Sequence, residues 1–210
     1  MLKVWGRATS VNVQKVMWAV GEMGIAHERI DVGGRFGGLT TPAFLALNPS
    51  ARIPTIEDDG VVVWESNAII RYLAARYGEG ALWARDPGAR APADAWMDWM
   101  QTTLAPDFYG VFWAVVRTPA DRRDRAAIKD LTKQLTGHYE LLDRQLATRP
   151  YLVGDGFSLA DIAVGVTLYR YFEMEIERPA LSNLHAWYKR LKERPAFRDH
   201  VMVSFEELRG

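Results

Sequence analysis

The sequence predicts two structural parts, an α/β unit with a mixed sheet followed by an all-helical domain. Strand and helix patterns alternate over roughly the first eighty residues. The composition then shifts at Gly78–Pro92, which holds three Gly and two Pro in fifteen residues. No strand pattern of comparable quality follows. We therefore expect domains at 1–78 and 93–210, joined by a linker at 79–92.

Four short apolar stretches predict the strands of the first part, at Leu2–Trp5, His27–Val32, Ile53–Glu57 and Val61–Trp64. The turn Asp58-Asp59-Gly60 joins the last two as a hairpin. Helical spacing of apolar residues, together with start and stop signals, predicts three helices, at Val11–Met23, from Thr41-Pro42 and from Ser66. The order of elements is therefore β-α-β-α-β-β-α.

The second part has only helical patterns. The predicted helices are Ala93–Arg117, Asp121–Ala147, Ser158–Phe172 and Asn183–Glu193. Pro106 is expected to kink the first of them, because proline lacks the N–H that continues the helical hydrogen bonds.

Composition excludes several classes of protein. The 210 residues include 26 Lys+Arg and 26 Asp+Glu, so no charge excess supports nucleic-acid or anionic-membrane binding. No apolar run approaches the ~20 residues that span a bilayer, and the N-terminal residues lack a signal-peptide pattern. The absence of cysteine excludes a disulfide framework, a thiolate metal site and a cysteine nucleophile. We expect a soluble cytoplasmic protein.

The segment Thr9-Ser10-Val11-Asn12 lies between a predicted strand and a helix. Helix capping is the simpler interpretation, because Ser and Asn are preferred caps. A helix N-terminus also carries unpaired N–H groups and roughly half a positive charge. A hydroxyl there could therefore stabilise a ligand thiolate, whose pKa is otherwise about 8.5.

Two further segments combine loop chemistry with a strand end. Ser66 can cap a helix, but a hydroxyl and N–H groups at this position also bind carboxylates, and Glu65 beside it suits an ammonium group. The Ile53-Pro54 bond opens a strand and is a candidate cis bond. The Ile53 N–H and C=O could then pair with an extended peptide ligand.

Three motifs in this order resemble the cytosolic glutathione transferases over nearly the whole chain. Two belong to the thioredoxin-like glutathione-binding domain of that family, namely Arg52-Ile53-Pro54-Thr55-Ile56 and Glu65-Ser66-Asn67-Ala68-Ile69-Ile70-Arg71-Tyr72-Leu73. The third, Gly154-Asp155-Gly156-Phe157-Ser158-Leu159-Ala160-Asp161-Ile162-Ala163, matches the capping box of its helical domain. The resemblance implies a detoxifying homodimer that joins glutathione, its co-substrate, to small hydrophobic electrophiles.

The resemblance also implies roles for single residues. Ser10 faces the glutathione sulfur, with Asn12 as a second polar group and Thr9 as an alternative to Ser10. Ile53 pairs with the cysteinyl unit next to a cis Pro54, and Glu65 and Ser66 hold the γ-glutamyl end. Arg52 and Phe36-Gly37 approach the glycyl end. Trp5 near the place of a catalytic tyrosine, and the lack of cysteine, favour a bacterial serine- or threonine-type member.

The electrophile site is expected on the first helix of the second domain, lined by Tyr109, Phe112, Trp113 and Arg117. The same stripe could instead be core or dimer interface, because aromatic stripes usually serve packing. Two other functions stay open. One is glutathione-dependent reduction of disulfides or peroxides, and the other is a non-catalytic binding module of the same fold. The four scattered histidines predict neither a catalytic triad nor a metal site.

Overall fold

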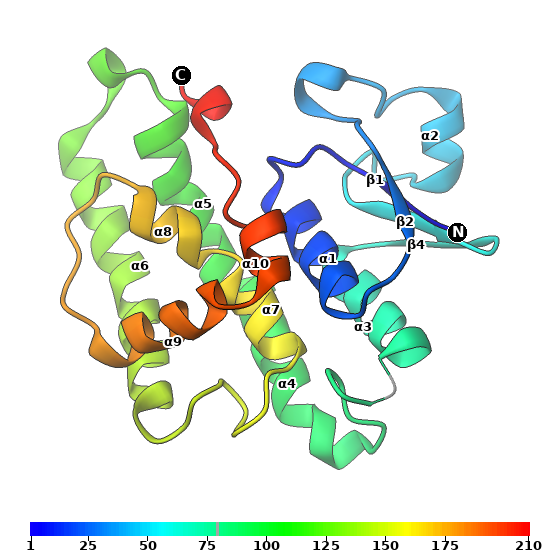
Figure 1. The fold of residues 1–210 in the computed structure, drawn as a ribbon. Helices are drawn as coiled ribbons and strands as arrows, with labels where there is room; N and C mark the ends of the chain where they lie inside the picture. Colours follow the sequence, from blue (N-terminus) through cyan, green and yellow to red (C-terminus); the bar gives the residue numbers. More distant parts are fainter. Residues whose placement is uncertain (79) are drawn as a thin grey trace. The chain divides into compact units, whose positions relative to one another are not determined.

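The computed structural model describes residues 1–78 and 80–210, so the first residue of the predicted linker lies outside the described residues. The chain forms two compact units (Figure 1). The first comprises Met1–Ala89 and Pro195–Val203, and the second comprises Arg90–Arg194 and Ser204–Gly210. This division differs from the predicted one, because a segment near the C-terminus belongs to the first unit.

The first unit is built on a four-stranded mixed sheet, as the sequence predicts. Its strands are β1 (Leu2–Trp5), β2 (His27–Ile30), β3 (Thr55–Asp58) and β4 (Val61–Trp64), in the order β2-β1-β3-β4. Strand β1 pairs parallel with β2 and antiparallel with β3, and β3 pairs antiparallel with β4. Val4 and Ile56 are opposite each other and fully buried, so the two central strands supply the core of the sheet.

The helices of this unit are α1 (Val11–Glu22), the 3-10 turn η1 (Gly34–Phe36), α2 (Pro42–Leu47) and α3 (Ser66–Tyr77). Helix α1 packs against α3 through fully buried apolar side chains. The connection from β1 to α1 needs glycine at position 6, where φ is +153° and a Cβ would come within 2.3 Å of Val13. This close approach brings the start of α1 next to the end of β1.

Helix α10 (Pro195–His200) completes the first unit by packing on α1, contrary to the predicted domain 93–210. The fully buried Trp18 ring meets Phe197 edge to face, with 4.8 Å between ring centroids. A Cβ on Gly21 would lie 2.8 Å from the Ala196 Cβ, so glycine allows the two helices to approach. The apolar surface of α1 thus obtains its cover from a segment almost 180 residues further along the chain.

The first predicted helix of the second part is a chain of four helical segments, α4 (Pro87–Trp99), η2 (Met100–Leu104), α5 (Ala105–Phe112) and η3 (Trp113–Arg117). Helix α4 begins inside the predicted linker, and η2 and η3 are π-helical turns. Pro106 lies in the first turn of α5, directly after η2. Because proline has no N–H to donate, the regular i→i−4 hydrogen bonds are interrupted here, and the π turn lies directly before that interruption.

The remaining helices are α6 (Arg125–Gln145), α7 (Leu159–Gly165), α8 (Leu168–Glu173) and α9 (Ser182–Lys192), with 3-10 turns η4 (Ala120–Arg122), η5 (Leu146–Thr148) and η6 (Glu206–Leu208). The predicted helix at 158–172 is therefore divided. Thr167 lies at the break and its hydroxyl donates to the Val164 carbonyl at 2.9 Å. Such a side-chain bond competes with the backbone bonds that would continue the helix.

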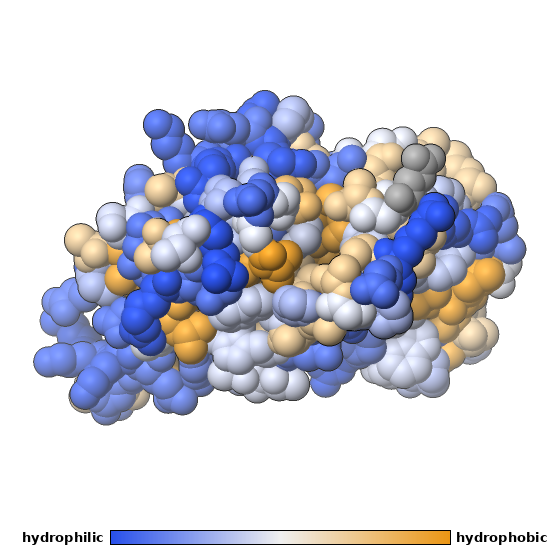
Figure 2. Space-filling view, turned by 90° about the horizontal axis from the view of Figure 1, so that it is seen from below, coloured by the Kyte–Doolittle hydropathy of each residue, from blue (hydrophilic) through white to orange (hydrophobic). Residues whose placement is uncertain are grey.

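The predicted capping box at the start of α7 is confirmed. The Ser158 N–H donates to the Asp161 carboxylate at 3.0 Å, within a reciprocal Ser–Asp cap. Among the described residues, no helix is both long and apolar enough to cross a membrane. In Figure 2, hydrophobic side chains show in separate groups between hydrophilic ones.

Candidate functional site

Strand register brings three of the predicted segments to one edge of the sheet. Trp5 at the end of β1 pairs with Thr55 at the start of β3, which pairs with Trp64 at the end of β4. The residues just beyond these strand ends are therefore neighbours at the same edge. They are the loop leading to Ser10, the Ile53-Pro54 segment and the Glu65–Ser66 segment.

Ser10 occupies the N-cap position of α1 but does not cap it. Its backbone is extended, with φ −91° and ψ 122°, and its side chain makes no cap hydrogen bond. The side chain is partly exposed, whereas Thr9 before it is buried. The capping interpretation is thus wrong for the Ser10 hydroxyl, which stands at the positive end of a helix dipole.

Ser66 is likewise not a cap, because the N-cap residue of α3 is Glu65. Glu65 has φ +68°, a conformation that is strained for a residue with a side chain and that concentrates at ligand sites. The Glu65 side chain is exposed, while Ser66 is 3% exposed. The Ser66 hydroxyl donates to Asn12 Oδ1 at 3.3 Å. Asn12 is therefore joined to the start of α3.

Sequence reasoning missed Lys15, which is fully buried in α1. Its Nζ donates to Ser66 Oγ at 3.1 Å and to Asn67 Oδ1 at 2.9 Å. Burial lowers the pKa of Lys15 to about 7, with the Glu65 charge opposing this shift and the Arg71 charge adding to it. The available signal was a lysine within the apolar pattern of a helix, but that pattern does not identify the partner.

The Ile53-Pro54 bond is cis, as predicted. The Ile53 backbone takes part in none of the loop and turn hydrogen bonds found among the described residues. Asn48, a few residues before this bond, is buried and holds the segment by donating to the Arg52 carbonyl at 2.9 Å and to Thr55 Oγ1 at 3.0 Å.

The glycine-rich loop begins beside the same segment. A Cβ on Gly33 would lie 3.2 Å from the Ile53 side chain. Phe36 and Gly37 further along the loop are exposed, and the Arg35 guanidinium lies over the Phe36 ring at 4.8 Å. The Arg52 side chain is also exposed. The side chains of Phe36 and Arg52 are thus accessible from solvent.

The four residues predicted for an electrophile site differ in their exposure to solvent. Phe112 is 3% exposed and packs in the second unit against Phe205, with ring centroids 5.6 Å apart, and under the Arg170 guanidinium. Trp113 is 61% exposed, and Arg117 lies over its ring at 5.4 Å. Tyr109 is partly exposed, and burial raises the pKa of its hydroxyl. Phe112 therefore has a packing role, while the other three keep accessible surface.

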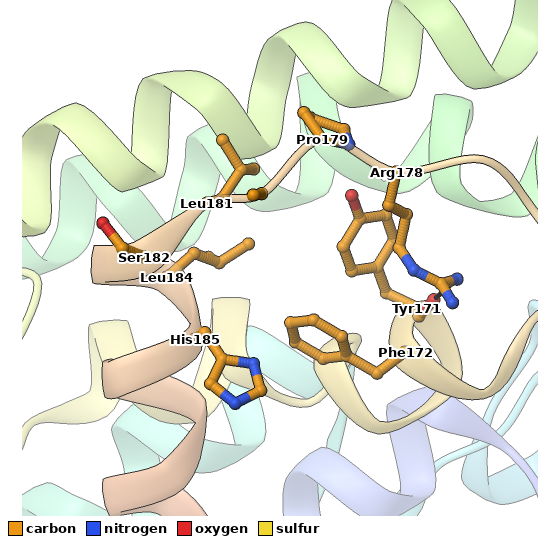
Figure 3. A pocket seen from close by; sticks show the side chains of 9 residues that line it. Tyr171, Phe172, Arg178, Pro179, Leu181, Ser182, Leu184 and His185 are labelled. Atoms are coloured by element: carbon orange, nitrogen blue, oxygen red, sulfur yellow. Dashed lines mark hydrogen bonds between the residues drawn. The ribbon is translucent and has the colours of Figure 1, made fainter.

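The second unit also contains a pocket of about 410 Å³, with none of those four residues in its lining. Figure 3 shows the Phe172, Leu184 and Tyr171 side chains around it, with Arg178 and His185 at its sides. The buried Tyr171 hydroxyl has no hydrogen-bond partner among the described residues. Within residues 1–78 and 80–210, no three or more His, Asp or Glu side chains are grouped so that they could hold a metal ion.

Two family models match this chain. They are "Glutathione S-transferase, N-terminal domain" over residues 9–76 and "Glutathione S-transferase, C-terminal domain" over residues 125–190. One match lies within each structural unit, and the first includes the Ser10, Ile53-Pro54 and Glu65–Ser66 segments.

Individual relatives agree with these matches. The chain is 41% identical to glutathione S-transferase GstB of Escherichia coli over 97% of its length and 99% of that protein. It is 30% identical to glutathione S-transferase 3 of Zea mays, over 95% of this chain and 93% of the other. A crystal structure of a theta class glutathione S-transferase from Xanthomonas axonopodis pv. citri, with glutathione bound, superimposes with a TM-score of 0.92 and 48% identity, covering 97% of this chain and 98% of that one. The chain therefore belongs to the glutathione S-transferase family, a family of transferases that use glutathione as their co-substrate.

Proposed function

We propose that this protein conjugates the thiolate of glutathione to small hydrophobic electrophiles, with Ser10 stabilising the thiolate. The observation that carries this proposal is the Ser10 hydroxyl, which makes no cap hydrogen bond at the N-terminus of α1. It lies at the sheet edge that also holds the cis Pro54 and the Glu65–Ser66 segment. The similar Xanthomonas protein, solved with glutathione bound, supports glutathione as the ligand of this edge.

Each part of glutathione has a matching group at this edge. The γ-glutamyl carboxylate accepts from the Ser66 hydroxyl at the N-terminus of α3, and the exposed Glu65 carboxylate pairs with the γ-glutamyl ammonium. The cysteinyl unit pairs with the Ile53 backbone in the manner of an added strand. The glycyl carboxylate is assigned to the exposed Arg52 and the loop at Phe36-Gly37.

The chemistry requires the thiolate, because the thiol is a poor nucleophile. Ser10 donates its hydroxyl hydrogen to the sulfur, and the dipole of α1 adds positive potential, so both favour the charged form. Asn12 is the second polar group at the sulfur, and its amide nitrogen Nδ2 is the atom that can donate to the thiolate. The sulfur then forms the new bond to the electrophile, whose leaving group departs with the bonding electrons.

For the electrophile we propose the accessible surface of Tyr109, Trp113 and Arg117, with Phe112 supporting it from the core. An apolar surface of this kind discriminates weakly, by about 1–3 kcal/mol per methylene, which suits a detoxifying enzyme of broad specificity. We also propose a cytoplasmic homodimer. The dimer is supported by the edge strand β4, where Val62 and Trp64 share one face and remain 38% and 41% exposed.

The decisive experiment is a pH titration of the ultraviolet absorbance of the glutathione thiolate in the presence of the protein. The wild-type protein is expected to give a saturable thiolate signal with a pKa below the free value of about 8.5. Ser10→Ala should raise that pKa by about 1–2 units and lower turnover of an aryl halide about tenfold to hundredfold, because one charge-assisted hydrogen bond is lost. Ser10→Thr keeps a hydroxyl and serves as the matched control.

The affinity for glutathione should change little in Ser10→Ala, because the γ-glutamyl and cysteinyl contacts remain. Unchanged turnover in this variant would reject the role of Ser10, and the same assay on Thr9→Val would then test the neighbouring hydroxyl. A thiolate signal without conjugation of any electrophile would favour reduction of disulfides or peroxides. No thiolate signal at millimolar glutathione would favour the non-catalytic module.

A further inference from the structure

Lys15 connects the two helices that form the proposed glutathione site. It extends from the middle of α1, and its side chain is fully buried. The ammonium contacts Ser66 Oγ at 3.1 Å and Asn67 Oδ1 at 2.9 Å, and these are the first two residues of α3. A positive charge from one helix is therefore held against the N-terminus of another.

The sign of this charge is unfavourable for the protein without ligand. A helix N-terminus carries about half a positive charge and favours anions, so a cation there is repelled. Burying an ammonium adds a desolvation cost. Burial is the largest cause that lowers the pKa of Lys15 to about 7, and the Arg71 charge adds to it while the Glu65 charge opposes it. An arrangement that favours an additional anion is expected where an anionic ligand binds.

Other charged groups around α1 do not account for the lowered pKa of Lys15. The His200 ring of α10 would lie 3.2 Å from a Cβ added at Gly21 of α1. Gly21 is six residues after Lys15, which is about 9 Å along the axis of α1. In the sheet, Lys3 Nζ pairs with Glu57 Oε2 at 3.8 Å, at partly exposed positions. Among the described residues, the charges that shift the pKa of Lys15 are those of Glu65 and Arg71.

The ammonium also decides where the Ser66 proton points. A protonated lysine only donates, so it occupies a lone pair of Ser66 Oγ and leaves the hydroxyl hydrogen for another acceptor. That acceptor is now Asn12 Oδ1, at the long distance of 3.3 Å. A carboxylate is a stronger acceptor and would take over this hydrogen. A neutral amine, by contrast, has a lone pair that can accept the Ser66 hydrogen itself.

We propose that Lys15 is a positioning residue for the γ-glutamyl carboxylate of glutathione. Its ammonium directs the Ser66 hydroxyl, and the amide nitrogen of Asn67, toward the carboxylate, and the bound carboxylate in turn stabilises the ammonium. Protonation of Lys15 and binding of glutathione therefore favour each other. This inference rests on the proposed function, in which Ser66 binds that carboxylate.

The test uses S-methylglutathione, which keeps the γ-glutamyl end but has no ionisable thiol. Titration calorimetry between pH 6 and 8 gives its Kd, and buffers of different ionisation enthalpy give the number of protons taken up. The variants are Lys15→Met and, as a matched control, Gln14→Met. Gln14 directly precedes Lys15 on α1 and is also buried, and its side-chain amide has no hydrogen-bond partner among the described residues.

The wild-type protein should take up about half a proton per ligand near pH 7, where the free site is about half protonated. Its affinity should fall as the pH rises from 6 to 8. Lys15→Met should bind about tenfold to hundredfold more weakly at pH 6, because a charge-assisted contact network is lost, and should lose this proton uptake. Gln14→Met should behave like the wild type, and any titration of the ligand amine cancels between variants.

Absence of proton uptake in the wild type would overturn the proposal, and this result needs no variant to fold. An unchanged affinity and pH profile in Lys15→Met would overturn it as well, because a merely structural lysine would leave both intact. Ser66→Ala separates the two proposals. Full affinity in Ser66→Ala would reject the carboxylate assignment itself, whereas a weakened Ser66→Ala beside an unaffected Lys15→Met would reject only the role of Lys15.

Discussion

A charged side chain is buried at a helix N-terminus in each of the two units, and the two charges are opposite. Asp161 in the second unit lies in the first turn of α7, where a negative charge is favourable. Lys15 in the first unit contacts the first turn of α3, where a positive charge is unfavourable. Both side chains are fully buried, so the difference does not come from exposure to solvent.

Asp161 and Lys15 also differ in how many segments they bind through hydrogen bonds. The Asp161 carboxylate accepts from the Ser158 N–H and hydroxyl at 3.0 Å, from the Leu152 N–H at 3.0 Å and from Trp187 Nε1 at 3.1 Å. Its pKa is still raised to about 6, because burial outweighs these four donors. Asp161 thus joins three segments of its unit. Lys15 contacts one helix start, at the place where we assign the ligand.

We infer that Asp161 serves the fold, because it accepts hydrogen bonds from three segments of its unit, whereas Lys15, whose charge opposes the helix dipole, serves binding. Stability and ligand affinity should therefore respond differently to the loss of each. Four substitutions test this, beginning with the largest expected effect.

Asp161→Ala should lower the free energy of unfolding by about 3–5 kcal/mol, because several buried donors would lose their acceptor. Urea denaturation followed by circular dichroism measures the effect. Asp155→Ala, at an exposed carboxylate in the same loop, is the control and should change stability by less than about 0.5 kcal/mol. A loss below about 1 kcal/mol in Asp161→Ala would contradict the structural role.

The pKa of Asp161 also gives a direction for pH. In the folded protein the pKa of Asp161 is about 6, above the ordinary aspartate value of 3.8. Its contribution to stability is therefore fully present below about pH 3.8 and is lost as the pH rises through about 6. The stability of the wild type relative to Asp161→Asn, which cannot titrate, should accordingly fall across that window.

Asn48→Ala should lower stability by about 2 kcal/mol, since all four hydrogen-bonding positions of this buried amide are used. Its Oδ1 accepts from the Ser50 N–H at 2.9 Å and the Ser50 hydroxyl at 2.7 Å, in addition to the two bonds donated by Nδ2. Affinity for S-methylglutathione should also fall, because Asn48 holds the segment before Pro54. Ser50→Ala, which removes only one of these bonds, should cost less than half as much.

Lys15→Met should not destabilise the protein at pH 6, in contrast to Asp161→Ala. The folded pKa of Lys15, about 7, lies below the ordinary lysine value of 10.5, so the cost of burying the charge is fully present below pH 7. This cost disappears as the pH rises from about 7 to about 10.5. The variant should therefore be more stable than the wild type at pH 6, with the difference shrinking toward pH 10. A variant less stable than the wild type at pH 6 would break the comparison.

Gln14→Met should raise stability by about 1 kcal/mol, the smallest of these effects, because a buried amide without a partner in the described residues is replaced by an apolar side chain of similar size. Affinity for S-methylglutathione should stay at the wild-type value. A loss of affinity would mean that the neighbourhood of Lys15, and not its charge, determines binding.

The sequence by itself predicts the features that depend on residues close to one another along the chain. Alternating and helical periodicity predicts the mixed sheet and the helical second part, and the Ser158–Asp161 box and the cis Pro54 both appear where their local motifs place them. Each of these signals acts within a few residues, so it can be read without knowing the rest of the fold. The three segments of the proposed glutathione site were found in the same way.

Tertiary packing decided what those motifs touch. Lys15 and Ser66 are 51 residues apart, and Phe197 covers Trp18 from almost 180 residues away. Periodicity placed Phe112 in an aromatic stripe that could line a site or serve packing, and only the contact with Phe205 shows that Phe112 is buried. Local patterns indicate which face of an element is apolar, but the partner of that face, and the charge buried with it, depend on which distant segments pack together. The division into two units follows from such contacts, because α10 completes the core beside α1.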